Sequence, residues 1–395
     1  MMGRNFNMLK RTVTSLCLRA ALTPLKLLPM KKNRVLFTAY LEKQYSCNPR
    51  YISEELKRMY GDRLEIGWLF RHPENFKYLE EQGIRVLGTK NLQSTLFAMT
   101  SRVIVSNTYF KPSLPRRRNQ FILYTWHGGG AYKKVGDSKK QNFIEKFYTH
   151  IRESGGKLYL SSSDFFTEKV VRDSFHYRGE VLSKGMPRND MLMNGLPEEK
   201  KAVIREKIGL KDGEKLVLYA PTYRKDTCVH AFNPDYARLC ENLSRRFGGK
   251  YVCGYRSHHV TMYKPQNGAD AGALNLTDYP DMQELLAVCD VLVTDFSSSI
   301  WDAAVGGVKA LLYFTDMDEF DMEKDFFTDV RSWPFPLAKN EEELEKNILE
   351  FDENAYQAAC AEHLKSLGST ESGRASYYAA KRIGYETGLE EDYDR

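Results

Sequence analysis

Residues 121–130 read Phe-Ile-Leu-Tyr-Thr-Trp-His-Gly-Gly-Gly, so a continuous apolar segment runs directly into a histidine and three glycines. Such a run is typical of a strand buried on both faces of a parallel sheet. Glycines after a strand let the backbone approach a ligand closely and present N–H groups to an anion. We expect His127 and Gly128 at the carboxyl end of this strand, where His127 can take a proton from a hydroxyl group. The plainer interpretation is a glycine turn with an incidental histidine.

Short apolar runs alternate with helical patterns on both sides of this stretch. The chain of 395 residues exceeds the size of one ordinary core, and the pattern restarts after residue 195. The alternation predicts an α/β protein with two doubly wound halves that face each other across a cleft. Strands are expected at residues 34–40, 64–70, 84–87, 102–106, 121–126, 158–161, 180–183, 215–220, 250–255, 291–294 and 309–314. Helices are expected at 51–60, 92–99, 143–152, 164–175 (with Asp164 as N-cap), 235–247 and 300–305.

The same pattern suggests four segments along the chain. A basic amphipathic segment covers residues 1–33, the first Rossmann-like domain 34–195, the second 196–370, and a helical tail 371–395. Seven scattered cysteines without a CxxC pair argue against a zinc ribbon or a disulfide scaffold and fit a reducing compartment. No stretch approaches the roughly 18 apolar residues of a membrane-spanning helix.

The positive charge is concentrated at the N-terminus. The net charge is +6, but residues 1–41 hold eight basic residues and no acidic one, so the remainder carries −2. The protein as a whole is therefore not a basic nucleic-acid binder. Leu9, Val13, Leu16 and Ala20 follow helical spacing among these cations, which indicates an interfacial helix on an anionic membrane surface. The alternative is an N-terminal helix docked on the protein's own body, whereas Arg19 interrupts any secretory signal.

A second histidine follows another expected strand. In Arg256-Ser-His258 the arginine and the histidine are two residues apart, so in an extended segment both point to one side and could address one phosphate. A structural histidine or a metal pair with His259 is the alternative. A metal is weakly supported, because no acidic or cysteine partner stands at a usual ligand spacing.

Hydroxyl and carboxylate side chains follow the expected strand at 291–294. Thr294, Asp295, Ser297 and Ser298 precede a helix, and the N-terminus of a helix can bind an anion. An ordinary N-cap explains the same residues. Asp302, one turn into that helix, could face the same site or the solvent.

Two further loops complete the candidate site. Pro221, Thr222 and Arg224 follow the expected strand at 215–220, where Arg224 is either a diphosphate partner or a surface residue. Arg188, Asn189 and Asp190 follow the strand at 180–183 and either line the cleft or cap a helix. Neither a GxSxG elbow nor a GxxxxGK[ST] loop is present, so serine-hydrolase and P-loop chemistry are unsupported.

Taken in order, these motifs resemble the CDP-glycerol glycerophosphotransferases of wall teichoic acid and capsule synthesis. The matching segments lie within about residues 120–320 and are Trp126-His127-Gly128, Gly185-x-Pro187-Arg188-Asn189-Asp190, residues 219–224, Arg256-x-His258, residues 293–298, Asp302 and Tyr313-Phe314-x-Asp316. The family commonly has His-Gly-Thr-Pro where this chain has His127-Gly-Gly-Gly, so the loop beside the histidine differs. The chain shows no long N-terminal extension, which favours priming or limited addition over polymerisation.

The resemblance implies a GT-B-like fold whose first domain binds the acceptor and whose second binds the CDP donor. It implies transfer of glycerol phosphate from CDP-glycerol to a lipid-linked, undecaprenyl-type saccharide acceptor, with CMP released at the cytoplasmic face of the membrane. By motif match, His127 is the catalytic base and His258 the second essential histidine. Arg256, Thr294, Asp295, Ser297 and Ser298 fall in the CDP pocket. The resemblance implies no cofactor, and cationic side chains on the leaving group make a metal unnecessary.

Several alternatives stay open at this stage. The alditol can be ribitol instead of glycerol, so that the donor is CDP-ribitol. The fold alone does not exclude a GT-B transferase that uses a nucleotide-sugar. A catalytically silent membrane-surface module is a third possibility, disfavoured by the two histidine motifs and the anion loop. A homo-oligomer is compatible with the sequence.

Overall fold

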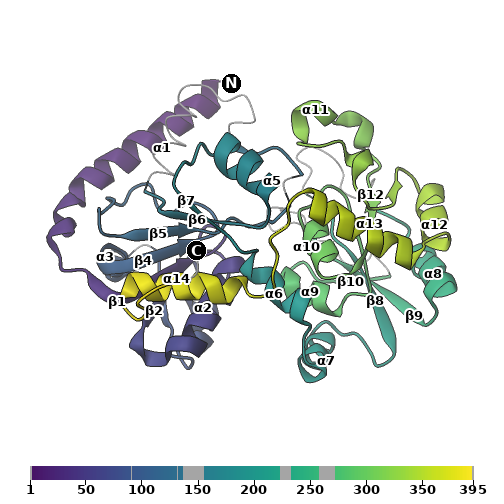
Figure 1. Cartoon of the computed structure of the whole chain (residues 1–395), viewed down its shortest axis with the longest axis horizontal. Helices are drawn as coiled ribbons and strands as arrows, with labels where there is room; N and C mark the ends of the chain where they lie inside the picture. Colours follow the sequence, from purple (N-terminus) through teal and green to yellow (C-terminus); the bar gives the residue numbers. More distant parts are fainter. Residues whose placement is uncertain are drawn as a thin grey trace.

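Two α/β domains lie side by side in the computed structural model of the chain (Figure 1). The structure describes residues 2–89, 91–130, 132–136, 155–222, 233–257 and 272–393. Each domain has a parallel sheet with helices packed on it, which confirms the predicted pair of facing Rossmann-type domains. The expected helix at 143–152 lies outside the described residues.

The first sheet has the strand order β3-β2-β1-β4-β5-β6-β7. Its strands are β1 Lys31–Thr38, β2 Glu65–Phe70, β3 Arg85–Gly88, β4 Ser101–Ser106, β5 Phe121–Tyr124, β6 Leu158–Ser161 and β7 Glu180–Ser183. The strand order reverses between β1 and β4, which pair in parallel. Ligands of doubly wound sheets bind at such a switch point, outside the carboxyl ends of the strands.

The second sheet is also parallel and also reverses its strand order, which is β10-β9-β8-β11-β12-β13. Its strands are β8 Glu214–Tyr219, β9 Lys250–Tyr255, β10 Ala273–Asn275, β11 Val291–Thr294, β12 Lys309–Tyr313 and β13 Leu337–Ala338. The two edge strands, β10 and β13, were not expected from the sequence, because runs of three and two residues carry no period to recognise. The switch point of this sheet lies between β8 and β11. Each domain therefore has a switch point at the cleft.

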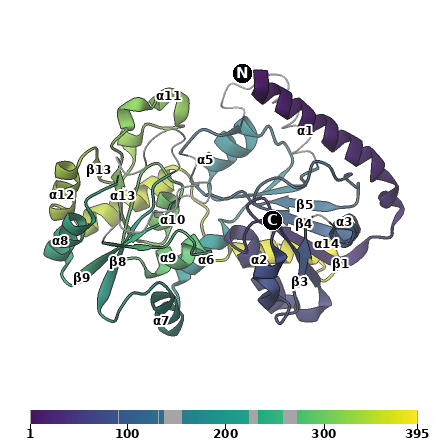
Figure 2. The same ribbon diagram turned by 180° about the vertical axis from the view of Figure 1, so that it is seen from behind.

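Helices cover the faces of both sheets (Figures 1 and 2). In the first part of the chain they are α1 Met2–Ala21, α2 Cys47–Tyr60, α3 Leu92–Thr100, α5 Asp164–Phe166, which continues as a π-helix over Thr167–Ser174, and α6 Asp190–Asn194. In the second part they are α7 Glu198–Lys207, α8 Tyr236–Phe247, α9 Met282–Val288, α10 Ser299–Val305, α11 Met322–Asp325, α12 Glu341–Leu349, α13 Glu353–Ser366 and α14 Ala375–Thr387. The prediction of Asp164 as an N-cap is wrong. The hydroxyl oxygen of Ser163 accepts the Phe166 N–H instead, at 3.0 Å, so the cap lies one residue earlier than expected and Asp164 is the first residue of the helix.

The C-terminal helix returns to the first domain. The chain crosses from the second domain after α13, and α14 packs on α2 and beside β1 and β4 (Figure 1). Ala379, Ala380 and Ile383 are fully buried in the first hydrophobic core. Burying this apolar face stabilises the crossing, since each fully buried aliphatic side chain contributes about 1.5–3 kcal/mol. The first domain is thus completed by residues from the end of the chain.

An ion-pair cluster connects the two domains beside the cleft. The Arg50 guanidinium of α2 pairs with Asp281, the N-cap of α9, at 3.2 Å and with Glu284 of α9 at 2.7 Å. Asp281 is fully buried. Burial lowers the pKa of Arg50, but the Asp281 carboxylate and its acidic neighbours outweigh this and raise the pKa above its ordinary value. The arginine therefore stays charged and holds α2 against α9.

We expect Arg50→Gln to lower the free energy of unfolding by about 2–3 kcal/mol, because it leaves the buried Asp281 carboxylate without its cation. Arg58→Gln on the same helix is the matched control. Its ion pair with Glu55 is surface-exposed, with the arginine side chain 68% accessible, so a loss below about 1 kcal/mol is expected. Urea denaturation of both variants measures the difference, and equal losses would contradict a stabilising role of the Arg50–Asp281 ion pair.

Candidate active site

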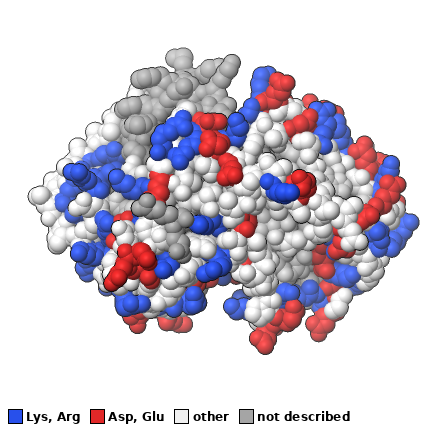
Figure 3. Space-filling view, in the orientation of Figure 1, with Lys and Arg blue, Asp and Glu red and all other residues white. Residues whose placement is uncertain are grey.

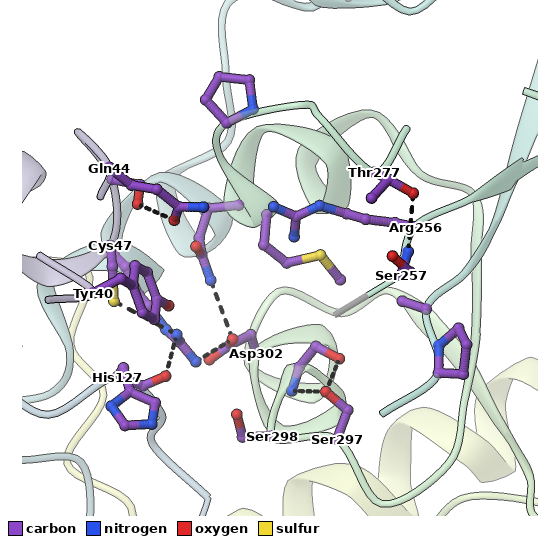
Figure 4. A pocket seen from close by; sticks show the side chains of 18 residues that line it. Tyr40, Gln44, Cys47, His127, Arg256, Ser257, Thr277, Ser297, Ser298 and Asp302 are labelled. Carbon is purple, nitrogen blue, oxygen red and sulfur yellow. Dashed lines mark hydrogen bonds and ion pairs between the residues drawn. The ribbon is translucent and has the colours of Figure 1, made fainter. Parts of the chain in front are cut away.

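A pocket lies between the two domains, where the carboxyl ends of their strands meet (Figure 4). The first domain contributes residues after β1, β5 and β7, and the second contributes residues after β8, β9, β10 and β11. The lining includes Tyr40, Gln44, Ser46, Cys47, His127, Arg188, Ala220, Pro221, Arg256, Ser257, Thr277, Pro280, Met282, Gln283, Ser297, Ser298, Ser299 and Asp302. Of the residues expected from the sequence, seven line it: His127, Arg188, Pro221, Arg256, Ser297, Ser298 and Asp302.

His127 is held in one tautomer by a backbone carbonyl. Its Nδ1 lies 3.1 Å from the carbonyl oxygen of Asn107, which follows β4. Because a carbonyl oxygen only accepts, Nδ1 carries the proton in the neutral ring, and Nε2 carries the lone pair. The imidazole also packs against the Trp126 ring, with centroids 4.1 Å apart. Such a histidine is prepared to accept a proton at Nε2.

The backbone around His127 is strained where the loops leave the strands. Trp126 has φ +54°, and in the loop after β1 Tyr40, Leu41 and Glu42 have φ between 45° and 68°. Non-glycine residues rarely adopt these angles and cluster at functional sites when they do. The surrounding contacts hold the strained loop after β1 in place: the side-chain oxygen of Asn107 accepts the Tyr40 N–H at 2.8 Å.

The three glycines after His127 allow the two domains to approach each other closely. A Cβ on Gly128 would lie 2.9 Å from Ser298 Oγ, one on Gly129 would lie 2.5 Å from Trp301 Nε1, and one on Gly130 would lie 2.9 Å from Trp301 Cβ. Ser298 caps α10, and Trp301 lies within it. The glycines were expected to admit a ligand; in the structure they admit helix α10 of the second domain. Trp301 occupies the space that a side chain at 129 would need, and Trp301 and Tyr132 together occupy the space that one at 130 would need.

A buried ion pair crosses the domain interface below the histidine. Arg188 Nη2 donates to Asp302 Oδ2 at 2.5 Å, and Arg188 Nη1 donates to the carbonyl oxygen of His127 at 2.6 Å. Arg188 is 4% exposed and Asp302 1%. Burial lowers the pKa of Arg188, but the Asp302 carboxylate more than compensates and raises it above the ordinary value. The charged arginine therefore links the loop that carries His127 to helix α10.

On the side of the second domain, hydroxyl groups and a guanidinium face the pocket. Arg256 Nη2 donates to the carbonyl oxygen of Tyr279 at 3.0 Å, while its Nε has no hydrogen-bond partner among the described residues. Ser297 Oγ accepts from the Ser299 hydroxyl at 2.9 Å. The N–H groups of Ile300 and Trp301 donate to carbonyl oxygens of Ser297 and Ser298. The serine hydroxyls and Arg256, more than the first N–H groups of α10, are thus the polar groups offered to a ligand.

Other expected site residues lie behind the pocket and do not line it. Thr294 Oγ1 donates to the carbonyl oxygen of Ala220 at 2.7 Å, and Asp295 accepts from the N–H and the hydroxyl of Thr222. These bonds join the loops after β11 and β8. Asp190 accepts the N–H groups of Ala375 and Ser376 at the start of α14. Asn189 is fully buried and donates to Glu371.

Two expected residues, His258 and Arg224, lie outside the described residues. Their roles stay predictions from the sequence. The last described residues before them are Ser257 after β9 and Thr222 after β8. Ser257 and Pro221 line the pocket.

Asn48 and Glu371 support the site and were not found from the sequence. The Asn48 side chain donates to the carbonyl oxygens of Thr125 and Trp126 and accepts the Arg188 N–H at 3.0 Å. It therefore ties α2 to the loops that carry His127 and Arg188. No sequence signal marks it. Asn107, in contrast, directly follows a strand, and that position could have identified it.

Glu371 lies in the segment that crosses back to the first domain. Its carboxylate accepts from the N–H of Met186, from Asn189 Nδ2 and from Trp301 Nε1 at 2.8–3.1 Å. Burial raises its pKa to about 7 against the opposing effect of these three donors. One carboxyl group thus holds the segment before Arg188, helix α10 and the C-terminal crossing together.

We expect Glu371 to make stability pH-dependent between about pH 4.5 and pH 7. Below this window the carboxyl group is protonated in both the folded and the unfolded chain. Within it only the unfolded chain ionises, so the free energy of unfolding falls as the pH rises, and above it the contribution is constant. Glu371→Gln should lack this part of the slope in urea denaturation. Glu362→Gln, an exposed site on α13, should keep it, and identical slopes for both variants would refute the assignment.

In the described ranges no group of histidine, cysteine, aspartate and glutamate side chains is arranged to hold a metal ion. None of the described helices combines the length and the apolar character that crossing a bilayer requires.

The sequence matches a family model described as CDP-glycerol:poly(glycerophosphate) glycerophosphotransferase over residues 21–384. A teichoic acid glycerol-phosphate transferase of Staphylococcus aureus (strain NCTC 8325 / PS 47) is 27% identical over 398 residues, which cover 95% of this chain and 100% of the relative. A teichoic acid poly(glycerol phosphate) polymerase of Bacillus subtilis (strain 168) is 27% identical over 341 residues, or 84% of this chain. The chain spans only 45% of that polymerase. A teichoic acid ribitol-phosphate primase of Bacillus spizizenii (strain ATCC 23059 / NRRL B-14472 / W23) is 27% identical over 341 residues, which cover 80% of this chain and 81% of the primase.

Solved structures share the fold. A structure of the wall teichoic acid polymerase TagF has a TM-score of 0.79 and 24% identity, with 98% of both chains covered. A co-structure of MnaA with UDP from S. aureus has a TM-score of 0.51 and 11% identity over 91% of this chain and 99% of that one. At these identities the likeness establishes the arrangement of two facing Rossmann-type domains and nothing finer.

Proposed function

Because the chain belongs to the CDP-glycerol:poly(glycerophosphate) glycerophosphotransferase family, we propose that it transfers glycerol phosphate from CDP-glycerol to a hydroxyl group of a lipid-linked saccharide acceptor. CMP is the second product. The acceptor oxygen forms a bond to the β-phosphorus, and the bond from that phosphorus to the bridging oxygen breaks. The bridging oxygen leaves with CMP, and the acceptor proton passes to His127 Nε2.

The observation that carries this proposal is the position of His127 opposite polar groups of the other domain in one pocket. His127 comes from the first domain, and Arg256, Ser297 and Ser298 come from the second (Figure 4). Arg188, also of the first domain, lines the same pocket. A base on one side and donors for anionic oxygens on the other are what an in-line transfer between a hydroxyl and a diphosphate requires. Proton removal by a positioned base contributes roughly 10²–10⁴-fold to such a reaction.

On the donor side we assign Arg256, Ser297 and Ser298 to the diphosphate. The Arg256 Nε has no partner among the described residues and can donate to a phosphate oxygen. His258, two residues on, is assigned to the leaving group by the sequence resemblance alone. Positioned donors for the charge that develops on the leaving CMP are expected to be the largest single contribution to the rate.

We propose that α1 brings the enzyme to the cytoplasmic face of the cell membrane, where a lipid-linked acceptor is anchored. Four apolar side chains of α1 whose burial the structure describes face outward: Leu9, Val13, Leu16 and Leu18 are 39–51% exposed. Thr12 is buried instead, and Arg19 Nε donates to the carbonyl oxygen of Pro112. The helix is thus attached to the body through polar residues while an apolar stripe stays outside, as in interfacial helices.

A donor comparison tests the function. Purified protein is incubated with a lipid-linked saccharide acceptor and with CDP-glycerol, CDP-ribitol or a UDP-sugar, and the released nucleotide is quantified. We expect acceptor-dependent CMP from CDP-glycerol. CMP from CDP-ribitol only would assign the ribitol reaction, and UDP release would assign a glycosyltransferase. Binding of CDP-glycerol without turnover on any acceptor would leave a silent membrane-surface module.

A further inference from the structure

A basic groove, separate from the pocket between the domains, lies in the first domain at the amino ends of its strands. It is formed by the segment after α1, the start of β1, the loop between β4 and β5, and the end of α14. Its volume of about 840 Å³ lies within the roughly 300–1,000 Å³ typical of small-molecule sites. The side chains that give it its charge are Lys26, Lys32, Arg102, Arg116, Arg117 and Arg118.

We propose that this groove binds the phosphate headgroup of an anionic phospholipid. The inference rests on the proposed membrane contact of α1 and deepens it by naming the lipid class and the residues that select it. The groove is separate from the catalytic pocket, because the pocket lies at the carboxyl ends of the strands and the groove at their amino ends. A headgroup in the groove therefore leaves the cleft open to donor and acceptor.

Three of the six cations of the groove form no ion pair with a described residue. Glu386 is the one acidic residue in the described lining, and its carboxylate pairs with Arg102 and with Arg382 of α14. Lys26, Lys32 and Arg118 are exposed and form no ion pair with any described residue. Clustered cations of this kind attract anionic lipid, at about 1 kcal/mol for each Lys or Arg near the surface.

Two arginines shape the groove by binding backbone carbonyls. Arg117 donates to the carbonyl oxygens of Met99 at 2.7 Å and Leu28 at 2.8 Å, and Arg116 donates to those of Lys111 and Phe110. Arg117 thereby fixes the segment after α1 to the body of the domain. Arg116 and Arg117 therefore form a fixed floor of the groove. We expect this floor to stay in place when the exposed cations are changed, because its hydrogen bonds do not involve them.

The groove and the apolar side chains share one flank of the molecule. Leu27, next to Lys26 in the chain, is 89% exposed. Helix α1 runs along the outer edge of the first domain in both ribbon views (Figures 1 and 2). On the same flank, Lys and Arg side chains, in blue, lie next to a strip of surface without charged residues, in white (Figure 3). A lipid surface can bind both parts of this flank: its anionic headgroups attract the basic side chains, and its apolar interior accepts the exposed apolar side chains. A soluble polyphosphate would leave Leu27 and the stripe on α1 in water.

The test is vesicle co-sedimentation of the full chain. Vesicles of phosphatidylcholine with phosphatidylglycerol are compared with vesicles of phosphatidylcholine alone. The groove variant combines Lys26→Gln, Lys32→Gln and Arg118→Gln, which touch none of the bonds that hold the floor. The matched control combines Lys200→Gln, Lys207→Gln and Lys211→Gln, three exposed cations on and after α7 that form no ion pair with described residues. Both variants lose the same charge.

We expect the groove variant to bind the anionic vesicles about 100-fold more weakly than wild type and the control variant to bind them nearly as well. Equal losses in both variants, or no loss in either, would overturn the headgroup site while leaving α1 as the membrane contact. No binding of wild type to any vesicle would overturn both. Release from the vesicles by soluble glycerol phosphate oligomer, in wild type and not in the groove variant, would assign the groove to the polymer and overturn the lipid. CMP release on a detergent-solubilised acceptor should be unchanged in the groove variant, so that failure of the catalytic proposal is seen separately.

Discussion

His127→Ala should slow acceptor-dependent CMP release by roughly 10²–10⁴-fold. The structure gives a specific reason: the Asn107 carbonyl oxygen holds Nδ1 as the donor, so Nε2 is the atom that accepts the acceptor proton. Alanine removes that atom and leaves the hydroxyl without a base. Binding of CDP-glycerol should change little, because the donor contacts come from Arg256, Ser297 and Ser298 in the other domain. The expected loss is therefore in kcat.

Two further variants make this result specific. His127→Asn keeps a polar side chain of similar reach and should be as inactive as alanine, because an amide does not accept a proton at this pH. His72→Ala in the same domain should retain full activity, since that histidine side chain is 73% exposed and its one ion pair with a described residue is with Glu74. CMP release by His127→Ala within threefold of wild type would mean that another group is the base.

Arg188→Met should lower the free energy of unfolding by about 3–5 kcal/mol. It leaves the Asp302 carboxylate buried without a cation, and it removes the donor to the His127 carbonyl oxygen. Removing both charges, by Arg188→Met together with Asp302→Leu, should recover most of the lost stability, because a buried pair replaced by apolar side chains is often neutral. Urea denaturation of the two single variants and the double variant gives the coupling energy.

In the double variant, stability should recover while catalytic activity should not. The double variant is expected to fold but to stay slow in CMP release, because the loop that carries His127 has lost its tie to α10. A single variant within about 1 kcal/mol of wild type would show that the pair is not buried as described. Recovery of full activity by the double variant would show that Arg188 only stabilises the fold.

The sequence predicted every strand except the edge strands β10 and β13, and it predicted that functional residues follow the carboxyl ends of the strands, since both features appear in local patterns. The strands at 158–161, 180–183, 250–255 and 291–294 have the expected bounds. His127, Arg256, Ser297 and Ser298 come after such strands and are brought into one pocket. A polar residue at the carboxyl end of a buried strand is thus a sound signal for a position near the cleft.

The pairings across the cleft could not be predicted, because they join residues far apart in the chain. Arg188 and Asp302 are 114 positions apart, and no local pattern shows that they form an ion pair. Thr294 and Asp295 carry the same signal as Ser297, yet they turn toward Ala220 and Thr222 and join two loops. The glycines after His127 were interpreted as space for a ligand, whereas their nearest neighbours belong to Ser298, Trp301 and Tyr132.

The most direct measurement follows the β-phosphorus of the donor. CDP-glycerol labelled at that phosphorus is incubated with the protein and a lipid-linked acceptor, and the lipid and nucleotide fractions are counted. The account predicts that the label moves to the lipid fraction with unlabelled CMP in equal amount, and that His127→Ala abolishes this movement. Label that stays with the nucleotide as CDP, while glycerol reaches the acceptor, would contradict attack at the β-phosphorus and with it the proposed reaction.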